Sequence, residues 1–307
     1  MLLVTGITGH TGGYFLQELI KHNYKGHIRC VVRETSDTTQ IDNSGLLIEK
    51  VVGDINDKEF IENIMIDVEM VMHIYNIHHS PMILEAAIRN KVKRVIMVHT
   101  TGIYSTFKNA SKGYKMIENK VFELANSSDC KTKITILRPT MIYGDILDSN
   151  ISKFIKMVDK LRIFPVINRG DNLLQPVNAR DLGIALYDVI LYPKQTQGKA
   201  YDHSGSTPIK MIDLLKLISG ELNKNTIFVS IPLKVGVFAA KVLNLISLKK
   251  INYIEKVQRM AENRSYSHES ATTDFGYNPM PLKKGIQIEV AEYMEAKERN
   301  EESTNIS

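Results

Sequence analysis

The sequence predicts an α/β fold in which a parallel sheet carries helices on both faces and a smaller mixed lobe follows. In the first half of the chain, short apolar runs alternate with helix-like segments, as in parallel sheets with crossover helices. One run, residues 68–75, is apolar almost throughout, which is typical of a strand buried on both faces. With 307 residues, the chain can form one large core, or a core plus a smaller lobe.

The first 23 residues predict a strand, a turn and a helix. Residues 2–4 are an apolar run that is too short for anything but a buried strand. A helix is expected to follow, because its apolar residues recur at spacings that place them on one face. These residues are Phe15, Leu16, Leu19 and Ile20.

Three glycines lie between this strand and this helix, and in that context they indicate a phosphate-binding loop. Gly6 permits a tight turn, Gly9 lets a pyrophosphate approach the backbone, and Gly12 lets the helix pack closely on the strand. The N-terminus of the helix offers unpaired N–H groups and a positive dipole end to the anion. The alternative is an ordinary strand-to-helix turn that happens to be rich in glycine.

The alternation continues to about residue 145, and local signals place the elements. The turn at Lys25 and Gly26 leads into the second strand, Pro81 suits the first turn of a helix, and Pro139 ends the sixth strand. A polar loop is expected at residues 34–45. Strands are expected at residues 27–33, 46–53, 68–75, 92–99 and 133–138, and helices at residues 57–67, 81–90 and 113–125.

Beyond about residue 145 the alternation is less regular. Since no low-complexity linker separates the halves, we expect a dinucleotide-binding domain at 1–145 and a smaller lobe at 146–296 that is interwoven with it. Part of 170–205 is expected to return to the first sheet, and 297–307 to be a polar, frayed tail. Within the lobe, strands are expected at 173–177 and 199–202, and helices near 180–191, 209–219, 233–246, 251–262 and 282–296.

Composition restricts the partners and the compartment. The net charge is +5 and the basic residues are scattered, so we expect no nucleic-acid partner. Cys30 and Cys130 are too few for a disulfide framework and have no metal-ligand spacing, which favours a reduced, cytoplasmic protein without a metal site. No signal peptide is expected, because the N-terminus leads directly into a strand.

The longest apolar stretch, residues 226–248, is interrupted by Pro232, Lys234 and Lys241. We therefore expect no integral membrane segment. For residues 233–248 two alternatives stay open, a helix docked on the lobe and a helix on a membrane surface.

Seven short motifs occur in the order in which a known family carries them. In sequence they are TGITGHTGG (5–13), VVGDI (51–55), VMHIY (71–75), VIMVHTTGIY (95–104), ILRPTMIYG (136–144), LLQPVNARDLGIAL (173–186) and DFGYNP (274–279). The chain resembles the extended (atypical) short-chain dehydrogenase/reductase family to about residue 296. The resemblance implies a Rossmann doubly wound parallel sheet with helices on both faces, a small mixed C-terminal substrate lobe and a cleft between them. It also implies hydride transfer with NAD(P), and a homodimer through residues 113–125.

The end of the second strand bears on the choice of dinucleotide. An acidic residue there favours NAD, whereas an arginine accommodates the 2′-phosphate of NADP. Here Arg33 comes first and Glu34 follows, so we expect NADP; the alternative is NAD, with Glu34 on the ribose and Arg33 solvated. Asp54 and Ile55 match the family position that contacts adenine, although Asp54 is also a candidate helix cap. The expected cofactor-binding residues are Gly6, Thr8, Gly9, His10, Thr11, Gly12, Arg33, Asp54, Ile55, Tyr75 and Pro139.

The resemblance also implies a catalytic tyrosine, a serine or threonine that orients the substrate, and a lysine four residues after the tyrosine. Thr100 and Tyr114 match the first two, although a threonine that only bonds to the backbone and an aromatic that only packs would look the same. The lysine position holds Glu118. A carboxylate beside a phenol would raise the pKa of that phenol, which opposes proton transfer.

Two functions follow. The first is an NAD(P)-dependent oxidoreductase or epimerase-like enzyme that acts on a sugar nucleotide or another small carbonyl or hydroxyl compound, with Thr100 and Tyr114 as catalytic residues. The second is a catalytically silent NAD(P)-binding sensor or scaffold, which the Glu118 position favours.

Overall fold

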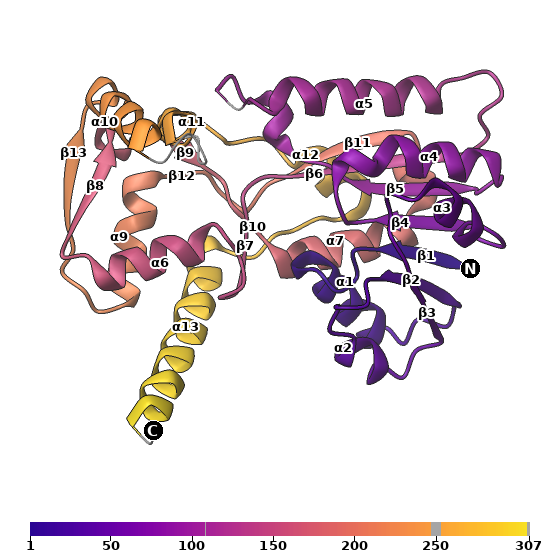
Figure 1. Cartoon of the computed structure of the whole chain (residues 1–307), viewed down its shortest axis with the longest axis horizontal. Coiled ribbons are helices and arrows are strands. Elements are labelled where there is room, and N and C mark those ends of the chain that lie inside the picture. The colour runs from indigo at the N-terminus through magenta and orange to yellow at the C-terminus, as the bar shows by residue number, and fades with distance from the viewer. Residues whose placement is uncertain (108, 247–252, 306–307) are drawn as a thin grey trace.

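The central sheet has seven strands, and every neighbouring pair in it is parallel. The structure, a computed structural model, describes residues 1–107, 109–246 and 253–305, and of residues 302–305 only the backbone. The strand order is β11-β6-β5-β4-β1-β2-β3, so the order reverses between β1 and β4 (Figure 1). The predicted fold class is confirmed. The strands are β1 (Leu2–Thr5), β2 (Ile28–Val32), β3 (Ile48–Val52), β4 (Met70–His73), β5 (Arg94–Val98), β6 (Lys133–Pro139) and β11 (Lys199–His203).

Helices cover both faces of this sheet, and each face has its own hydrophobic core. On one face, α1 (His10–Lys21) and α7 (Ala179–Leu191) bury their apolar side chains together with α12 (Glu269–Phe275). The other face is covered by α3 (Lys58–Ile64), α4 (Ser80–Arg89) and α5 (Ser111–Ala125). Two short helices, α2 (Thr39–Asp42) and α8 (Pro193–Thr196), and two 3-10 turns, Ile77–His79 and Thr101–Tyr104, lie in the connections.

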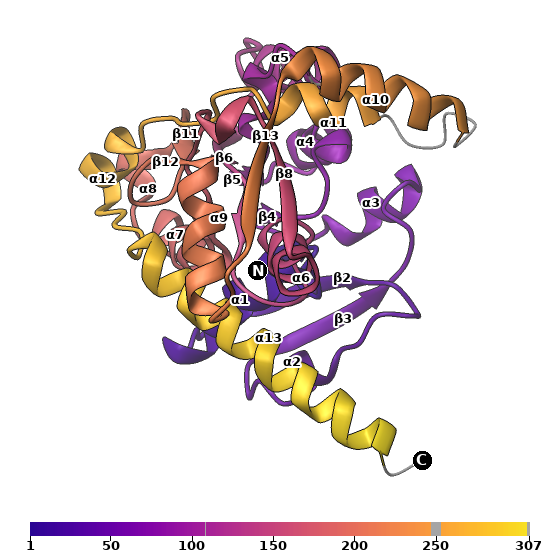
Figure 2. The same cartoon turned by 90° about the vertical axis from the view of Figure 1, so that its left-hand side faces the viewer.

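A second body of structure is built around a third core at the other end of the molecule. There α6 (Ile151–Lys160), α9 (Met211–Glu221) and α13 (Leu282–Asn305) pack together, beside the parallel pair β8 (Ile163–Ile167) and β13 (Ile227–Ile231) (Figure 2). The helices α10 (Leu233–Ile246) and α11 (Tyr253–Arg259) lie against each other on this body. Two further short pairs join β7 (Ile142–Tyr143) to β10 (Val177–Asn178), and β9 (Leu173–Leu174) to β12 (Ile209–Lys210).

Several expected elements differ from the observed ones. The expected strand at 173–177 is two strands in different sheets, because Pro176 has no N–H for a continuous ladder and the Gln175 side chain donates to the Gly205 carbonyl at 2.8 Å. The expected loop at 34–45 contains α2, and α6, β8 and β13 were not expected. The expected tail is helical to Asn305, and Lys297 Nζ lies 2.7 Å from Asp159 Oδ2.

The chain returns to the central sheet after entering the second body, because β11 pairs with β6 at the sheet edge. The domain boundary near residue 145 stays a prediction. The helix expected at 233–246 is α10, and α11 lies within the helix expected at 251–262; residues 247–252 of these two predictions lie outside the described part of the chain. Each helix in the ranges that the structure describes is too short or too polar to cross a bilayer.

Candidate functional site

A cavity of about 960 Å³ opens at the carboxyl ends of β1, β2, β4 and β5. This is where the strand order reverses, and open parallel sheets bind their ligands at such a point. The loop from β1 to α1 and residues 147–150, which follow β7, both line it. This volume lies at the upper end of the range of ligand-binding cavities.

The glycine loop needs glycine for reasons of space. Gly6 has φ +81°, and a Cβ there would lie 2.8 Å from the Tyr75 backbone nitrogen. A Cβ on Gly12 would lie 2.0 Å from the Gly6 carbonyl oxygen, so α1 could not approach β1 so closely with any other residue. Gly9 precedes α1 and supplies no side-chain cap, which leaves the N–H groups of the first turn directed at the cavity.

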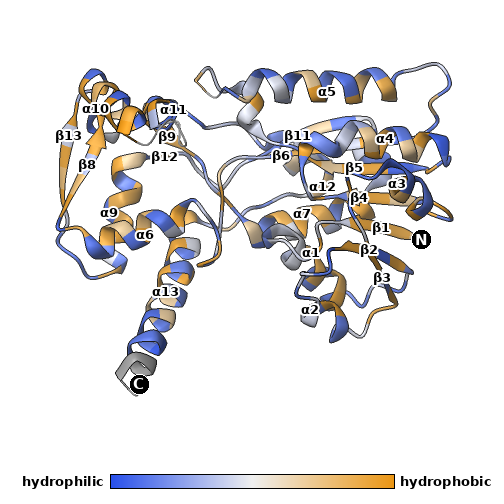
Figure 3. Ribbon diagram, in the orientation of Figure 1, coloured by the Kyte–Doolittle hydropathy of each residue, from blue (hydrophilic) through white to orange (hydrophobic). Residues whose placement is uncertain are grey.

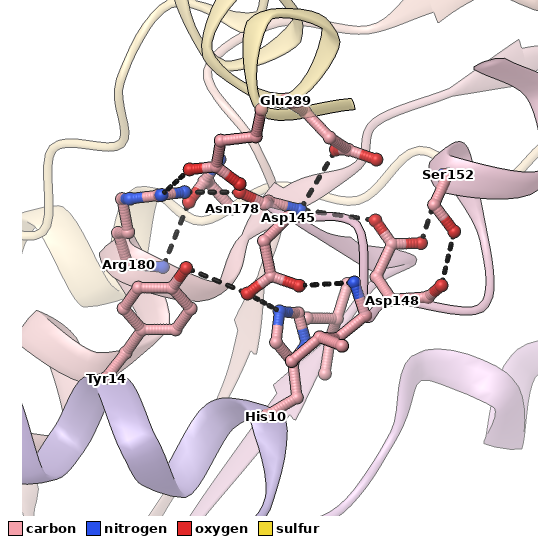
Figure 4. A network of polar contacts seen from close by, with 12 residues as sticks. His10, Tyr14, Asp145, Asp148, Ser152, Asn178, Arg180 and Glu289 are labelled. Carbon is pink, nitrogen blue, oxygen red and sulfur yellow. Dashed lines mark hydrogen bonds and ion pairs between the residues drawn. The ribbon is translucent and has the colours of Figure 1, made fainter. Parts of the chain in front are cut away.

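Asp145 braces the glycine loop from outside (Figure 4). Its Oδ2 lies 3.0 Å from His10 Nε2 and accepts a hydrogen bond of 2.9 Å from the Tyr14 hydroxyl. The Arg180 guanidinium lies over the Tyr14 ring, 4.9 Å from its centre. Burial alone would raise the pKa of Asp145, but the contacts with His10, the Leu147 N–H and Tyr14 lower it to about 2. The first turn of α1 is thereby fixed to the segment that follows β7.

The adenosine end of the cavity is bordered by Arg33 and Ser36, but Glu34 does not line it. The Arg33 side chain is exposed and has no ion pair among the residues that the structure describes. Asp54 also lines the cavity, and its Oδ1 accepts from the Asn56 N–H at 2.9 Å. The alternative role of Asp54 as a helix cap is wrong, because Asp57 caps α3.

Thr100 and Tyr114 line the opposite end of the same cavity. Thr100 Oγ1 accepts a 3.0 Å bond from the Gly102 N–H, so the hydroxyl proton is not used in that bond. The Tyr114 ring lies 5.6 Å from the His78 ring, centre to centre. Ile55 and Tyr75 are also at the wall, whereas Pro139 is buried away from the cavity and its carbonyl accepts from Thr101 Oγ1.

Glu118 does not project a lone charge towards Tyr114. Its buried carboxylate accepts from Arg138 Nη2 at 2.6 Å and lies 2.9 Å from His99 Nδ1. Burial alone would raise the pKa of Glu118, but the hydrogen bonds from His99 and Arg138 hold it below the ordinary value. Burial lowers the pKa of His99. Because an ionised carboxylate only accepts hydrogen bonds, the proton of this contact lies on His99 Nδ1, and Nε2 lies 3.1 Å from the Ser80 hydroxyl. The negative charge is compensated inside this network.

The three histidines that cluster in the sequence have separate partners. His73 Nδ1 lies 2.7 Å from Thr5 Oγ1, and burial lowers the pKa of His73 to about 3. His79 Nε2 lies 2.9 Å from Asn56 Oδ1, and His78 contacts Tyr114. None of the three lines the cavity, and they form no metal-ligand group among the residues that the structure describes.

Some residues at the cavity were not expected from the sequence. Ser36 and His99 follow the ends of β2 and β5, where parallel strands deliver ligand-binding residues, and that position was the available signal. Asp148, Ser149 and Asn150 form a polar cluster that begins four residues after the ILRPTMIYG motif, but no spacing rule connects such a cluster with a site.

Comparison with known proteins decides the class of ligand. Residues 6–155 match the family model described as NAD(P)H-binding. These residues form an NAD(P)H-binding domain. The glycine loop, Arg33 and Tyr114 all lie within it, and NAD(P) is therefore the cofactor class of the cavity. Which of the two dinucleotides it takes is not decided by this match.

The fold agrees with that assignment over almost the whole chain. UDP-glucose 4-epimerase from Thermotoga maritima, solved with UDP-glucose, superposes with a TM-score of 0.72 at 17% identity, over 96% of this chain and 99% of that one. Triphenylmethane reductase from Citrobacter sp., solved with NADP(H), gives 0.70 at 15% identity, over 93% and 98%. The predicted dinucleotide-binding class and the predicted fold are confirmed.

A curated relative matches over a shorter stretch. Sterol demethylase protein B of Methylococcus capsulatus is 30% identical over 115 residues, which are 32% of this chain and 33% of the relative. The match thus spans about a third of that relative's length.

Proposed function

We propose that the protein is an NADP-dependent reductase or epimerase-like enzyme that acts on a sugar nucleotide or another small carbonyl or hydroxyl compound. The observation that supports this proposal is the shared cavity: the glycine loop and Arg33 lie at one end, and Thr100 and Tyr114 lie at the other. Structures of the same fold include an epimerase with UDP-glucose and a reductase with NADP(H). Proteins of one fold act on different substrates, so the fold supports a class of compound and not a single one.

The residues present fit an NADP molecule. The close approach of Gly12 to the Gly6 carbonyl leaves a concave backbone surface for the pyrophosphate. Arg33 is at the cavity wall and could pair in bidentate fashion with a 2′-phosphate, and the Ser36 hydroxyl is beside it, with its Oγ 3.1 Å from the Arg33 N–H. Glu34 does not line the cavity, which supports NADP over NAD.

The chemistry assigned to this chain is orientation and proton transfer. When bound, the cofactor supplies or accepts the hydride. The Thr100 hydroxyl would donate a hydrogen bond to the substrate oxygen and orient it, because its own oxygen already accepts from the backbone. Tyr114 would exchange a proton with the same oxygen. Residues 147–150 also line the cavity and would contact a ligand in it.

A second candidate is favoured by the Glu118 network. The position where the resembled family carries a lysine is occupied by a buried carboxylate that is paired with Arg138 and His99. Without that lysine, the cavity has one cationic group fewer to hold the nicotinamide ribose. A protein that binds NADP and senses or scaffolds without turnover is consistent with this arrangement.

The test is one set of measurements on four proteins: the natural chain, Tyr114→Phe, Arg33→Ala and, as a matched control, Glu34→Ala. Arg33→Ala is expected to weaken NADPH binding by about tenfold in a fluorescence titration and to leave NADH binding unchanged, since it removes a charge-assisted contact to the 2′-phosphate. Glu34→Ala should change neither affinity.

Tyr114→Phe is expected to bind NADPH normally and to lose turnover in a screen of carbonyl compounds and sugar nucleotides. NADPH binding without turnover in the natural chain would favour the sensor. Tighter binding of NADH that is indifferent to Arg33→Ala would overturn the choice of NADP, and unchanged turnover in Tyr114→Phe would remove this residue from the mechanism.

A further inference from the structure

Helix α10 packs against the remainder of the molecule through its smallest residues. Gly236 and Ala240 are its buried residues, and they lie one helical turn apart on one face. A Cβ on Gly236 would lie 2.6 Å from Ile167 Cδ1 and 3.1 Å from Val257 Cγ1. The helix is therefore docked directly on β8 and α11, as one of the two sequence alternatives held, but this contact does not bury its large side chains.

The large apolar side chains of α10 point into solvent. Phe238 is 69% exposed, Leu245 76% and Ile246 73%. Together with Val235 and Val242 they recur at spacings of three and four residues, which places them in one stripe opposite Gly236 and Ala240. The apolar colouring of α10 is visible at its place on the outside of the molecule (Figure 3). A helix with apolar residues on both faces normally lies between two partners, and the residues that the structure describes cover only one face of α10.

Charge indicates the chemistry of that partner. Lys234 and Lys241 are exposed and seven residues apart, so they border the stripe on the same side. The sequence from residue 222 to 254 has five lysines and no aspartate or glutamate. A second copy of the chain, related by a two-fold axis, would bring these lysines against one another. A partner with an anionic outer layer and an apolar interior would pair with the lysines and also bury the apolar stripe.

The position of α10 suits such a surface. The helix lies at the end of the molecule that is remote from the central sheet, so a layer there leaves the NAD(P) cavity open (Figures 1 and 2). The same end carries the exposed apolar residues Ile163 of β8 and Ile227 and Val229 of β13, and Ile163 and Ile227 are paired across the two strands.

We propose that α10 docks the protein on the surface of a lipid bilayer that contains anionic headgroups. Phe238, Leu245 and Ile246 enter the boundary between headgroups and acyl chains, and Lys234 and Lys241 contact lipid phosphates. The helix lies in the plane of the interface and does not span it. This assignment concerns a different surface from the NAD(P) cavity and does not depend on the proposed catalysis.

The test is flotation of the full chain with vesicles of phosphatidylcholine alone and of phosphatidylcholine mixed with phosphatidylserine. Binding is expected to the mixed vesicles, and to weaken with salt. Lys234→Gln with Lys241→Gln should lower the partition coefficient about tenfold, and Phe238→Ser with Leu245→Ser by at least about tenfold. The control is Met116→Ser, which removes a side chain that is 64% exposed on α5 and should have no effect.

All of these side chains are exposed, so the circular dichroism melt of each variant should match the natural chain, which separates lost docking from lost folding. Failure to bind either vesicle overturns the proposal. So does equal binding to both vesicles, because the lysines would then have no role. A dimer in sedimentation velocity that the Phe238→Ser/Leu245→Ser variant dissociates, without vesicle binding, would assign the stripe to a second copy instead.

Discussion

Glu289 is a carboxylic acid that has no exposed surface. Its Oε2 accepts from the Gly144 N–H at 3.1 Å, and Asp148 lies beside it (Figure 4). Burial, followed by the hydrogen bond and charge of Asp148, raises the pKa of Glu289 to about 10. The group is therefore protonated and uncharged at neutral pH. Its hydrogen bond with Gly144 connects α13 to the segment after β7.

Glu289→Gln should therefore keep the structure and remove a pH dependence. A folded-state pKa above the unfolded value means that the protonated group stabilises the fold at low pH and that this stabilisation is lost as pH rises towards 10. The melting temperature of Glu289→Gln should thus exceed that of the natural chain by an amount that grows from pH 5 to pH 9. In free energy of unfolding, the difference between the two proteins should increase by at most about 1.4 kcal/mol per pH unit. A difference that stays constant over this range would show that Glu289 is not protonated in the fold.

Single residues also show why the glycine loop was predictable. The positive φ of Gly6 and the contact between Gly12 and the Gly6 carbonyl involve residues that are close in sequence, so the requirement for glycine is written locally. The partner of Glu118 is not. Arg138 lies twenty residues further along the chain, and only the pairing of β6 beside β5 brings it to α5. The sequence shows a carboxylate at position 118, but not that Arg138 pairs with it.

At the scale of elements, Glu118 ties α5 to the sheet. Its carboxylate bonds to Arg138 of β6 and to His99 at the end of β5, and Arg138 Nη1 continues the network to Asp202 of β11 at 3.3 Å. Three neighbouring strands and one helix therefore share one set of polar contacts. A lysine at this position, as in the resembled family, would stand against Arg138.

We expect Glu118→Gln to lower the free energy of unfolding by about 3 kcal/mol, since Arg138 would keep a buried charge with a weaker partner. Arg138→Gln should cost a similar amount, and the double variant clearly less than the sum of the two, because each single change already breaks the same contact. Denaturant unfolding of the four proteins measures this. Additive losses would mean that the two residues stabilise the fold independently.

Element prediction was most accurate where a segment is long and bounded by clear signals, as for α7 and α10. It was wrong at 173–177, because a short apolar run with a proline looks the same whether it forms one strand or two. The helix α6 and the strand β8, in segment 151–167, were not predicted. Their apolar residues face a core that is assembled from distant parts of the chain. Local patterns do not show such a core.

At the scale of the whole molecule, Asp145 joins the glycine loop to the segment that leads into the second body. Asp145 lies more than a hundred positions from both His10 and Tyr14 in the sequence, so no local pattern indicated this contact. The homodimer and the cytoplasmic compartment stay predictions, since the described structure is of one chain. The polar contacts of Asp145 are instead open to a direct test.

Asp145→Asn should lower the free energy of unfolding at neutral pH by about 2 kcal/mol, the value of a pKa shift from 3.8 to about 2. Because the folded-state pKa is depressed, this stabilisation is present above pH 4 and is lost as pH falls towards 2. The melting temperatures of the two proteins should therefore differ at pH 7 and converge near pH 2. Equal melting at pH 7 would show that the brace adds nothing to stability. The same variant should weaken NADPH binding, because the first turn of α1 is less fixed.

The central sheet is completed late in synthesis, because its edge strand β11 lies far along the chain. The segment that matches the NAD(P)H-binding family ends at residue 155, but β11 lies at Lys199–His203. Until those residues have left the ribosome, β6 is an open edge with unpaired backbone groups, and Arg94 lacks the 2.6 Å bond from its Nη2 to Thr196. A nascent chain or a fragment that ends at residue 155 leaves the β6 edge unpaired and able to pair with other chains. A fragment that avoids this route to aggregation therefore has to extend through β11.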